Sequence, residues 1–185
     1  MNRHPNLLNR NKTALIIIDI QERLARVMNK RETVVGNTVK LIRGFKILNA
    51  PVFYTEQYPK GLGGTDPAIL QHLDFIEPFV KAGFSVCSSE EFLQKINMTG
   101  VNQLVLAGME THVCVLQSAL DFLQAGFQVY VAADCVCSRK EFDYATALKR
   151  LTQKGVTITS TETVLFELMQ EAGSDKFKSI SQIIK

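Results

Sequence analysis

Three residues of this sequence carry the side chains needed to attack a carbonyl carbon: a thiol, a carboxylate and an ammonium group. Asp19 directly follows a short apolar run, Lys81 lies just before a weaker one, and Cys114 comes shortly after a third. In an open parallel sheet, ligands bind beyond the carboxyl ends of the strands, so polar residues just after strands are the first candidates for a site. The three residues therefore form a candidate catalytic triad.

The residues before Cys114 predict how its thiol is activated. Thr111 is suited to the N-cap position, which would place Cys114 in the first turn of a helix, among unpaired backbone N–H groups at the positive end of the helix dipole. That setting favours the thiolate; a cation such as Lys81 would lower the pKa of the thiol further, and Asp19 could receive its proton. The same N–H groups could hold the oxyanion of a tetrahedral intermediate.

Each of the three residues also has an ordinary interpretation. A single Cys early in an apolar helix often packs in a core, and an Asp after a strand often forms a turn or caps a helix. A Lys near a Gly in the sequence is usually a solvated charge at the protein surface. Spacing alone does not bring the three side chains together, so the triad requires a fold that does.

Short, uniformly apolar runs alternate with segments of helical periodicity along the chain. Such runs are typical of strands covered on both faces, and apolar residues at every third or fourth position indicate helices. The sequence predicts strands at residues 15–18, 52–54, 84–86, 103–107, 127–131 and 156–159, and helices at residues 34–48, 90–96, 113–123, 142–151, 164–170 and 177–184. This alternation predicts an α/β fold, a three-layer αβα sandwich around a central, mostly parallel six-stranded sheet.

Local signals mark several helix ends and one long connection. Ser88–Glu91 and Ser138–Glu141 fit the S-x-x-E capping box, and Gly126 and Gly155 stand where helices should end. The segment 56–81 is rich in Gly and Pro. Long connections of this kind are usually functional or locally helical, so we expect it to lie over the site.

Length and composition limit the class of protein. The chain has 185 residues, of which 46% are hydrophobic and 21% charged, so we expect one globular domain over residues 1–185. Lys and Arg outnumber Asp and Glu by only 21 to 18, which argues against nucleic acid as a partner. No apolar stretch approaches the ~20 residues of a membrane span, so no membrane partner is expected. The N-terminus lacks an apolar secretory region, which predicts reduced cysteines and a cytoplasmic location.

Three segments around the candidate triad carry a family resemblance. They are Ala14–Gln21, which contains D-x-Q after the first strand; Lys81, which follows Pro78-Phe79-Val80; and Ala107–Val115, which contains G-x-E-T-x-x-C-V. In content, order and spacing these segments resemble the isochorismatase-like cysteine hydrolase family. The resemblance extends over nearly the whole chain and implies the isochorismatase-like, Rossmann-like form of the three-layer sandwich.

The resemblance implies a role for each member of the triad. Cys114 matches the family's nucleophile, Asp19 the general base that activates it, and Lys81 the group that stabilises the thiolate and orients the pair. The family has a non-proline cis peptide bond, here between Met109 and Glu110, and by analogy the N–H groups of Glu110 and Cys114 form the oxyanion hole. The implied reaction uses no cofactor: the thiolate attacks an amide or related carbonyl carbon, the leaving group departs, and water hydrolyses the thioester.

The resemblance also bears on metals and on the substrate. Nicotinamidases of this family carry D-x-H and a further His after the second strand, whereas Thr55–Pro59 here has a carboxylate but no His, and His72 is isolated. No metal is therefore expected. Four residues near strand ends are expected to contact a small-molecule substrate, although each could be an ordinary loop residue: Gln21, Glu56, Gln57 and Tyr58.

The other reactive side chains have ordinary interpretations. His112 neighbours the nucleophile at a helix start, where adjacent side chains diverge, so a structural or interface role is expected. Cys135 and Cys137 form C-x-C after the fifth strand, but no second cysteine pair completes a tetrahedral metal site, so packing in a loop is expected. Cys87 is expected to be inert.

Two classes of function stay open. The filled triad favours a cysteine-dependent hydrolase of a small amide or related carbonyl compound. The alternatives are a non-catalytic relative that binds a metabolite or acts in an assembly, and a hydrolase of an isochorismate-like enol ether, although some relatives with that activity lack the Cys. Selective alkylation of Cys114 near pH 6 would favour catalysis, and reactivity no greater than that of Cys87 would oppose it.

Apolar helix faces predict self-association. The helix at residues 113–123 and the C-terminal segments 166–168 and 177–184 carry apolar faces that one monomer is not expected to cover. Members of the family commonly form dimers or larger rings. We expect a homo-oligomer, and a monomeric mass in solution at micromolar concentration would contradict this.

Overall fold

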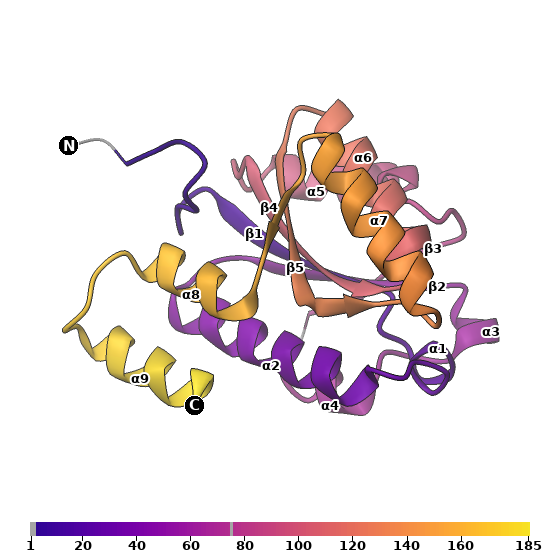
Figure 1. Ribbon diagram of the computed structural model, residues 1–185, viewed down its shortest axis with the longest axis horizontal. Helices are drawn as coiled ribbons and strands as arrows, with labels where there is room; N and C mark the ends of the chain where they lie inside the picture. The colour runs from indigo at the N-terminus through magenta and orange to yellow at the C-terminus, as the bar shows by residue number, and fades with distance from the viewer. Residues whose placement is uncertain (1–2, 75) are drawn as a thin grey trace.

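A six-stranded parallel sheet forms the middle layer of the molecule in the computed structural model, which describes residues 3–74 and 76–185 (Figure 1). The strands are β1 (Thr13–Ile18), β2 (Val52–Gln57), β3 (Phe79–Lys81), β4 (Gln103–Met109), β5 (Gln128–Cys137) and β6 (Thr157–Thr159). Their order in the sheet is β3-β2-β1-β4-β5-β6, and every neighbouring pair is parallel. The predicted α/β three-layer sandwich is confirmed.

Helices cover both faces of the sheet. The longer helices are α2 (Arg31–Ile47), α5 (Glu90–Asn97), α6 (Leu116–Gln124), α7 (Glu141–Gln153), α8 (Thr161–Met169) and α9 (Asp175–Ile184). One face is covered by α2, α8 and α9, and the other by α5, α6 and α7 (Figure 1). Within the described residues, no helix combines the length and the apolar composition needed to cross a membrane.

Among the described residues, five short helical elements lie in the connections between the strands. They are α1 (Glu22–Ala25), α3 (Pro59–Leu62), α4 (Pro67–Leu70), the 3-10 helix η1 (Val86–Ser88) and the π-helical turn η2 (Thr111–Val115). Helices α1 and α3 contact each other beyond the carboxyl ends of the strands (Figure 1). The long connection at residues 56–81 is therefore partly helical, as one of its two sequence-based interpretations requires.

The middle of the sheet is the most deeply buried part of the chain. Every residue of β1 and β4 is buried, because both strands are covered on both faces. At the carboxyl end of β1, Ile18 pairs in register with Thr55 of β2 on one side and with Gly108 of β4 on the other. The chain segments that leave these three strands therefore meet at one edge of the sheet.

The third strand lies earlier in the chain than predicted. The sequence predicts a strand at residues 84–86, but β3 ends at Lys81, and Val86 already begins η1. The Ser85 hydroxyl accepts a hydrogen bond from the Cys87 N–H and caps η1, so this segment turns away from the sheet. Lys81 is therefore the last residue of a strand rather than a residue that precedes one.

The fifth strand is longer than predicted. It continues through Cys137, so the C-x-C segment belongs to β5 and not to a loop. The polar residue Asp134 interrupts the apolar run, but its carboxylate accepts a hydrogen bond from the Thr161 N–H and is accommodated. The register of β5 against β4 shifts between Leu106 and Gly108, which lets the strand continue past this point.

Both predicted capping boxes are wrong in detail. Helix α5 begins after Ser89 rather than after Ser88, because the Ser88 hydroxyl donates to a backbone carbonyl of the preceding turn. Helix α7 has Lys140 at its N-cap and no side-chain cap. The Ser138 hydroxyl instead pairs with Nδ1 of His112 at 2.9 Å, so it serves a contact between elements rather than a helix end.

Two glycine substitutions are expected to change stability in opposite directions. A Cβ at Gly108 would lie 2.2 Å from the Ile18 carbonyl oxygen, and φ there is 149°. Gly108→Ala should therefore destabilise the protein by roughly 3 kcal/mol. Gly36 is exposed in α2 with nothing within 4 Å of an added Cβ, so Gly36→Ala should stabilise by about 0.5–1 kcal/mol. Urea unfolding measures both, and a neutral Gly108→Ala would contradict the close approach of β1 and β4.

Candidate active site

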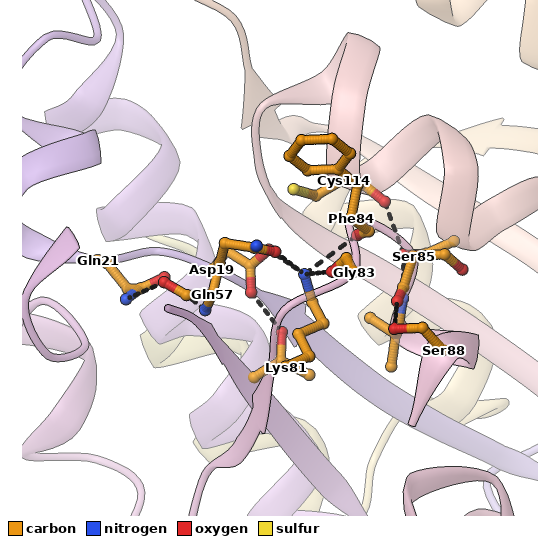
Figure 2. Close-up of polar contacts among 12 residues, drawn as sticks. Asp19, Gln21, Gln57, Lys81, Gly83, Phe84, Ser85, Ser88 and Cys114 are labelled. Carbon is orange, nitrogen blue, oxygen red and sulfur yellow. Dashed lines mark hydrogen bonds and ion pairs between the residues drawn. The ribbon is translucent and has the colours of Figure 1, made fainter. Parts of the chain in front are cut away.

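Asp19 lies where β1 ends and is fully buried. Its φ is 52°, in the left-handed region that Asp adopts more readily than most residues. The carboxylate oxygen Oδ1 accepts a 2.7 Å hydrogen bond from the Thr55 hydroxyl, and Oδ2 pairs with Nζ of Lys81 at 2.6 Å (Figure 2). Because each oxygen has a donor, the carboxylate is held in one orientation.

The Lys81 ammonium group is surrounded by oxygen atoms. In addition to the carboxylate, Nζ donates to Oε1 of Gln57 at 2.8 Å and to the carbonyls of Gly83 and Phe84 at 3.2 and 3.0 Å (Figure 2). The Lys81 side chain is only 1% exposed. A buried cation needs such partners to offset its lost hydration. Lys81 therefore fixes the Asp19 carboxylate on one side and the 83–84 turn on the other.

Cys114 lies in the π-helical turn η2, so the predicted cap at Thr111 is wrong. Glu110 occupies the N-cap position without a side-chain cap. Among the described residues, nothing forms a hydrogen bond with the buried Thr111 hydroxyl. The Cys114 carbonyl accepts a 2.6 Å hydrogen bond from Oγ of Ser118, which itself accepts one from the Val86 N–H. Ser118 thus connects the turn that carries the thiol to η1.

The Cys114 thiol is buried, and this reverses the expected direction of its pKa. The pKa of the thiol is raised to about 12, first by burial and then by the negative charge of Asp19, whereas Lys81 lowers it. Desolvation therefore outweighs the cation. The expectation of a lowered thiol pKa is wrong for the resting protein, in which the sulfur is protonated at neutral pH.

Glu110 lies between β4 and Cys114, and the peptide bond between Met109 and Glu110 is cis. Its carboxylate accepts hydrogen bonds from the backbone N–H of Arg139 at 2.9 Å and from Nε of the same residue at 3.2 Å. In the part of the chain that the structure describes, no oxygen accepts a hydrogen bond from the Glu110 N–H. The side chain of Glu110 is therefore anchored, while its N–H has no partner in these residues.

A cavity of about 120 Å³ opens beside the Cys114 thiol. The thiol shares the cavity with Gln57 and Glu110, and the Phe84 ring lies next to the sulfur (Figure 2). A larger cavity of about 520 Å³ lies at the amino-terminal edge of the sheet and includes no member of the triad, so size alone does not identify the site. Apolar side chains form the rest of the smaller cavity's wall: Leu24, Leu62, Phe84 and Val113.

Of the four residues expected to contact the substrate, Gln57 alone borders this cavity. The buried Gln21 amide instead forms two hydrogen bonds with the backbone of Gln57. Its Oε1 accepts a hydrogen bond from the Gln57 N–H, and its Nε2 donates one to the Gln57 carbonyl. Oε1 of Glu56 accepts hydrogen bonds from the N–H and the hydroxyl of Thr65. Tyr58 is 61% exposed. Gln21 and Glu56 therefore hold the connection after β2 in shape.

Three residues at the site are not indicated by the sequence patterns. The Thr55 hydroxyl orients the Asp19 carboxylate. Thr55 could have been found from the expected pairing of the first two strands, because it lies opposite Ile18, the residue before Asp19. Ser118 stands four residues after the thiol, a spacing that lets a helical hydroxyl reach the earlier carbonyl. Phe84 is predicted as part of a strand, and only the true position of β3 brings it to the cavity.

The remaining thiols and imidazoles lie outside the cavity. All four cysteines are free; Sγ of Cys135 lies 3.0 Å from the Thr161 hydroxyl, and burial raises the pKa of the Cys87 thiol to about 11. His112 faces Ser138, with Asp143 at 4.0 Å from Nε2. Over residues 3–74 and 76–185, no three side chains of the metal-binding types cluster together.

The sequence and the fold match those of one protein family. The isochorismatase domain model matches residues 13–163. Isochorismatase family protein 1B of Dictyostelium discoideum is 39% identical over 177 residues, which cover 94% of this chain and 86% of that protein. The secreted isochorismatase effector Isc1 of Phytophthora sojae is 38% identical, over 94% of this chain and 84% of its own length. The chain therefore belongs to the isochorismatase family.

A solved structure of the same fold gives a close structural match. It is the MAR1 ribonuclease from Caenorhabditis elegans, which has a TM-score of 0.91 and 34% sequence identity to this chain. The match covers 96% of this chain and 91% of that one. The three-layer architecture of this chain is therefore shared with that solved structure.

Proposed function

We propose that this protein is a cysteine hydrolase that cleaves a small amide or a related carbonyl compound through a thioester at Cys114. The observation that carries the proposal is the buried pair of Asp19 and Lys81, 2.6 Å apart, beside a thiol that opens on a small cavity. A buried ion pair is costly to maintain, and here it is held by further hydrogen bonds from Thr55 and to Gln57. Because these contacts hold the Asp19 carboxylate in place, it is suited to accept a proton and to return it.

In the proposed reaction, Sγ of Cys114 attacks the carbonyl carbon as its proton passes to Asp19. The raised pKa of the resting thiol means that the proton leaves as the bond forms rather than beforehand. The N–H groups of Glu110 and Cys114 stabilise the oxyanion. The proton returns from Asp19 to the leaving amine, and water, losing a proton to the same carboxylate, then hydrolyses the thioester and restores the thiol.

Gln57 is the proposed substrate contact among the four sequence-based candidates. Its side chain borders the cavity and also accepts a hydrogen bond from Lys81, so it connects the substrate to the ion pair. Gln21 is proposed to act indirectly, through its two hydrogen bonds to the Gln57 backbone. The proposed reaction uses no metal or cofactor.

Nucleic acid is not the proposed substrate, although the relative from C. elegans is called a ribonuclease. The described residues that line the cavity beside Cys114 include no Lys or Arg to bind phosphate.

We also propose that the protein forms a homo-oligomer and that it is located in the cytoplasm, although the Phytophthora relative is called secreted. Most of the apolar side chains expected to need a second copy are buried within the monomer, among them Phe122, Leu168 and Ile180, whereas Phe166 of α8 is 41% exposed and is open to a second copy.

A hydrolysis screen over small amides, ureides, enol ethers and an RNA oligonucleotide tests the proposed function. Each reaction is quenched in acid, and peptide mass spectrometry searches for an acyl group on Cys114. We expect at least one amide to release ammonia or an amine and to leave a transient acyl adduct on this residue. Turnover of enol ethers or RNA alone, or binding of amides with neither turnover nor adduct, would favour the alternatives.

A further inference from the structure

The charges around the cavity restrict what can bind beside Cys114. Among the described residues that line it, there is no Lys, Arg or His. Glu110 also borders the cavity, and its carboxylate oxygens accept hydrogen bonds from Arg139. The charge of Lys81 is directed elsewhere, because its Nζ, with three N–H donors, lies within hydrogen-bond distance of four oxygens and its side chain is 1% exposed. An anion that entered the cavity would lose its hydration without gaining a cation.

The negative charge of Glu110 is only partly balanced. Nε of Arg139 lies 3.2 Å from both carboxylate oxygens, but the Arg139 side chain is 61% exposed and therefore screened by water. The Glu110 side chain is 7% exposed, and its charge helps to raise the pKa of the Cys114 thiol. The carboxylate therefore acts on the sulfur through a medium with little water.

The size of the cavity sets a second limit. Its volume of about 120 Å³ is equivalent to about four water molecules at ~30 Å³ each, and it lies below the ~300–1,000 Å³ of most ligand pockets. Leu24, Leu62, Phe84 and Val113 make most of its wall apolar. A compact apolar group matches this lining, whereas the carboxylates of a larger ring would meet an apolar wall that holds no cation.

We infer that the site accepts compact, uncharged amides or related carbonyl compounds with an apolar acyl group, and that it rejects carboxylate-bearing substrates of the isochorismate type. The inference rests on the proposed function for the bond that reacts. The selection by charge is a property of the cavity alone and can be measured without turnover.

Alkylation of Cys114 by iodoacetamide and by iodoacetate tests this selection. The two reagents are similar in size and differ by one negative charge. The full chain is treated at about pH 9, peptide mass spectrometry follows Cys114, and each rate is divided by that of glutathione under the same conditions. We expect the normalised rate to be at least about tenfold higher for iodoacetamide. Equal normalised rates, or no reaction with either reagent, would overturn the inference and leave the acyl-adduct test unaffected.

Two variants should shift this ratio in opposite directions. Glu110→Gln removes the buried negative charge and should lower the preference for iodoacetamide, whereas Arg139→Gln leaves Glu110 uncompensated and should raise it. Glu162→Gln, an exposed position on α8 remote from the cavity, is the matched control and should leave the ratio unchanged. A change of the same sign in both site variants would indicate a structural effect and contradict selection by charge.

Discussion

Cys114→Ala is expected to lower the rate of amide hydrolysis by roughly 10⁴-fold or more, because it removes the atom that bonds to the carbonyl carbon. No other cysteine is among the described residues that line the cavity. The loss of one buried sulfur atom should cost about 1 kcal/mol of stability, so the protein should stay folded. Steady-state kinetics on an amide identified by the screen, together with urea unfolding, measures both effects.

Cys87→Ala is the matched control for this substitution. Cys87 lies in η1, is partly buried and does not line the cavity, so the variant should keep the activity of the wild type. A Cys114→Ala protein with wild-type turnover would show that the assignment of the nucleophile is wrong. Equal losses in both variants would point to a general effect of thiol removal on packing.

Asp19→Asn is expected to change two measurements in opposite directions. Asn keeps the shape of Asp and an acceptor oxygen, but it cannot take the proton of the thiol, so turnover should fall by roughly 10²–10⁴-fold. The Asp19 charge also raises the pKa of the Cys114 thiol, which is about 12 with Asp19 in place. Without this charge the pKa falls, and alkylation of Cys114 at pH 8 should accelerate, by about tenfold for each unit. Slower turnover together with slower alkylation would contradict the role of general base.

Lys81→Met is expected to have the opposite effect on the thiol and a large effect on stability. Lys81 lowers the pKa of Cys114, so its removal raises that pKa further and alkylation should become slower. The Asp19 carboxylate, 0% exposed in its side chain, would lose its cation, at a cost of about 3–5 kcal/mol. Lys46→Met breaks an exposed pair with Asp74 and should cost about 1 kcal/mol or less. A Lys81→Met protein as stable as this control would contradict the importance of the buried pair.

The resting state of the thiol also changes how catalysis can be detected. Selective alkylation of Cys114 near pH 6 requires that the pKa of its thiol be lowered, but burial raises this pKa. The pKa of the Cys87 thiol is raised less, to about 11. Cys114 should therefore be no more reactive than Cys87 toward a general alkylating reagent at neutral pH. The expectation from the sequence that such low reactivity would oppose catalysis is therefore wrong for the resting protein, and trapping of the acyl adduct is the measurement that tests catalysis.

Local patterns in the sequence determine most of the fold. The uniformly apolar runs at β1 and β4 need cover on both faces, and the helical periodicity between the strands supplies that cover through crossover connections. Asp19 and Cys114 follow these neighbouring strands and therefore end at the same edge of the sheet. The sequence predicts this much because periodicity reports directly which faces of an element are buried.

Contacts between distant segments decided the rest. Nothing local distinguishes residues 79–81 from residues 84–86 as the third strand; pairing of Thr55 with Phe79 does. The same holds for the thiol, whose pKa depends on burial and on Asp19, 95 positions away in the chain. Hydrogen bonds, desolvation and charge depend on distances in space, which spacing along the chain does not contain. The sequence alone therefore identified the candidate triad, and the tertiary structure decided the protonation state of the Cys114 thiol and the shape of the cavity beside it.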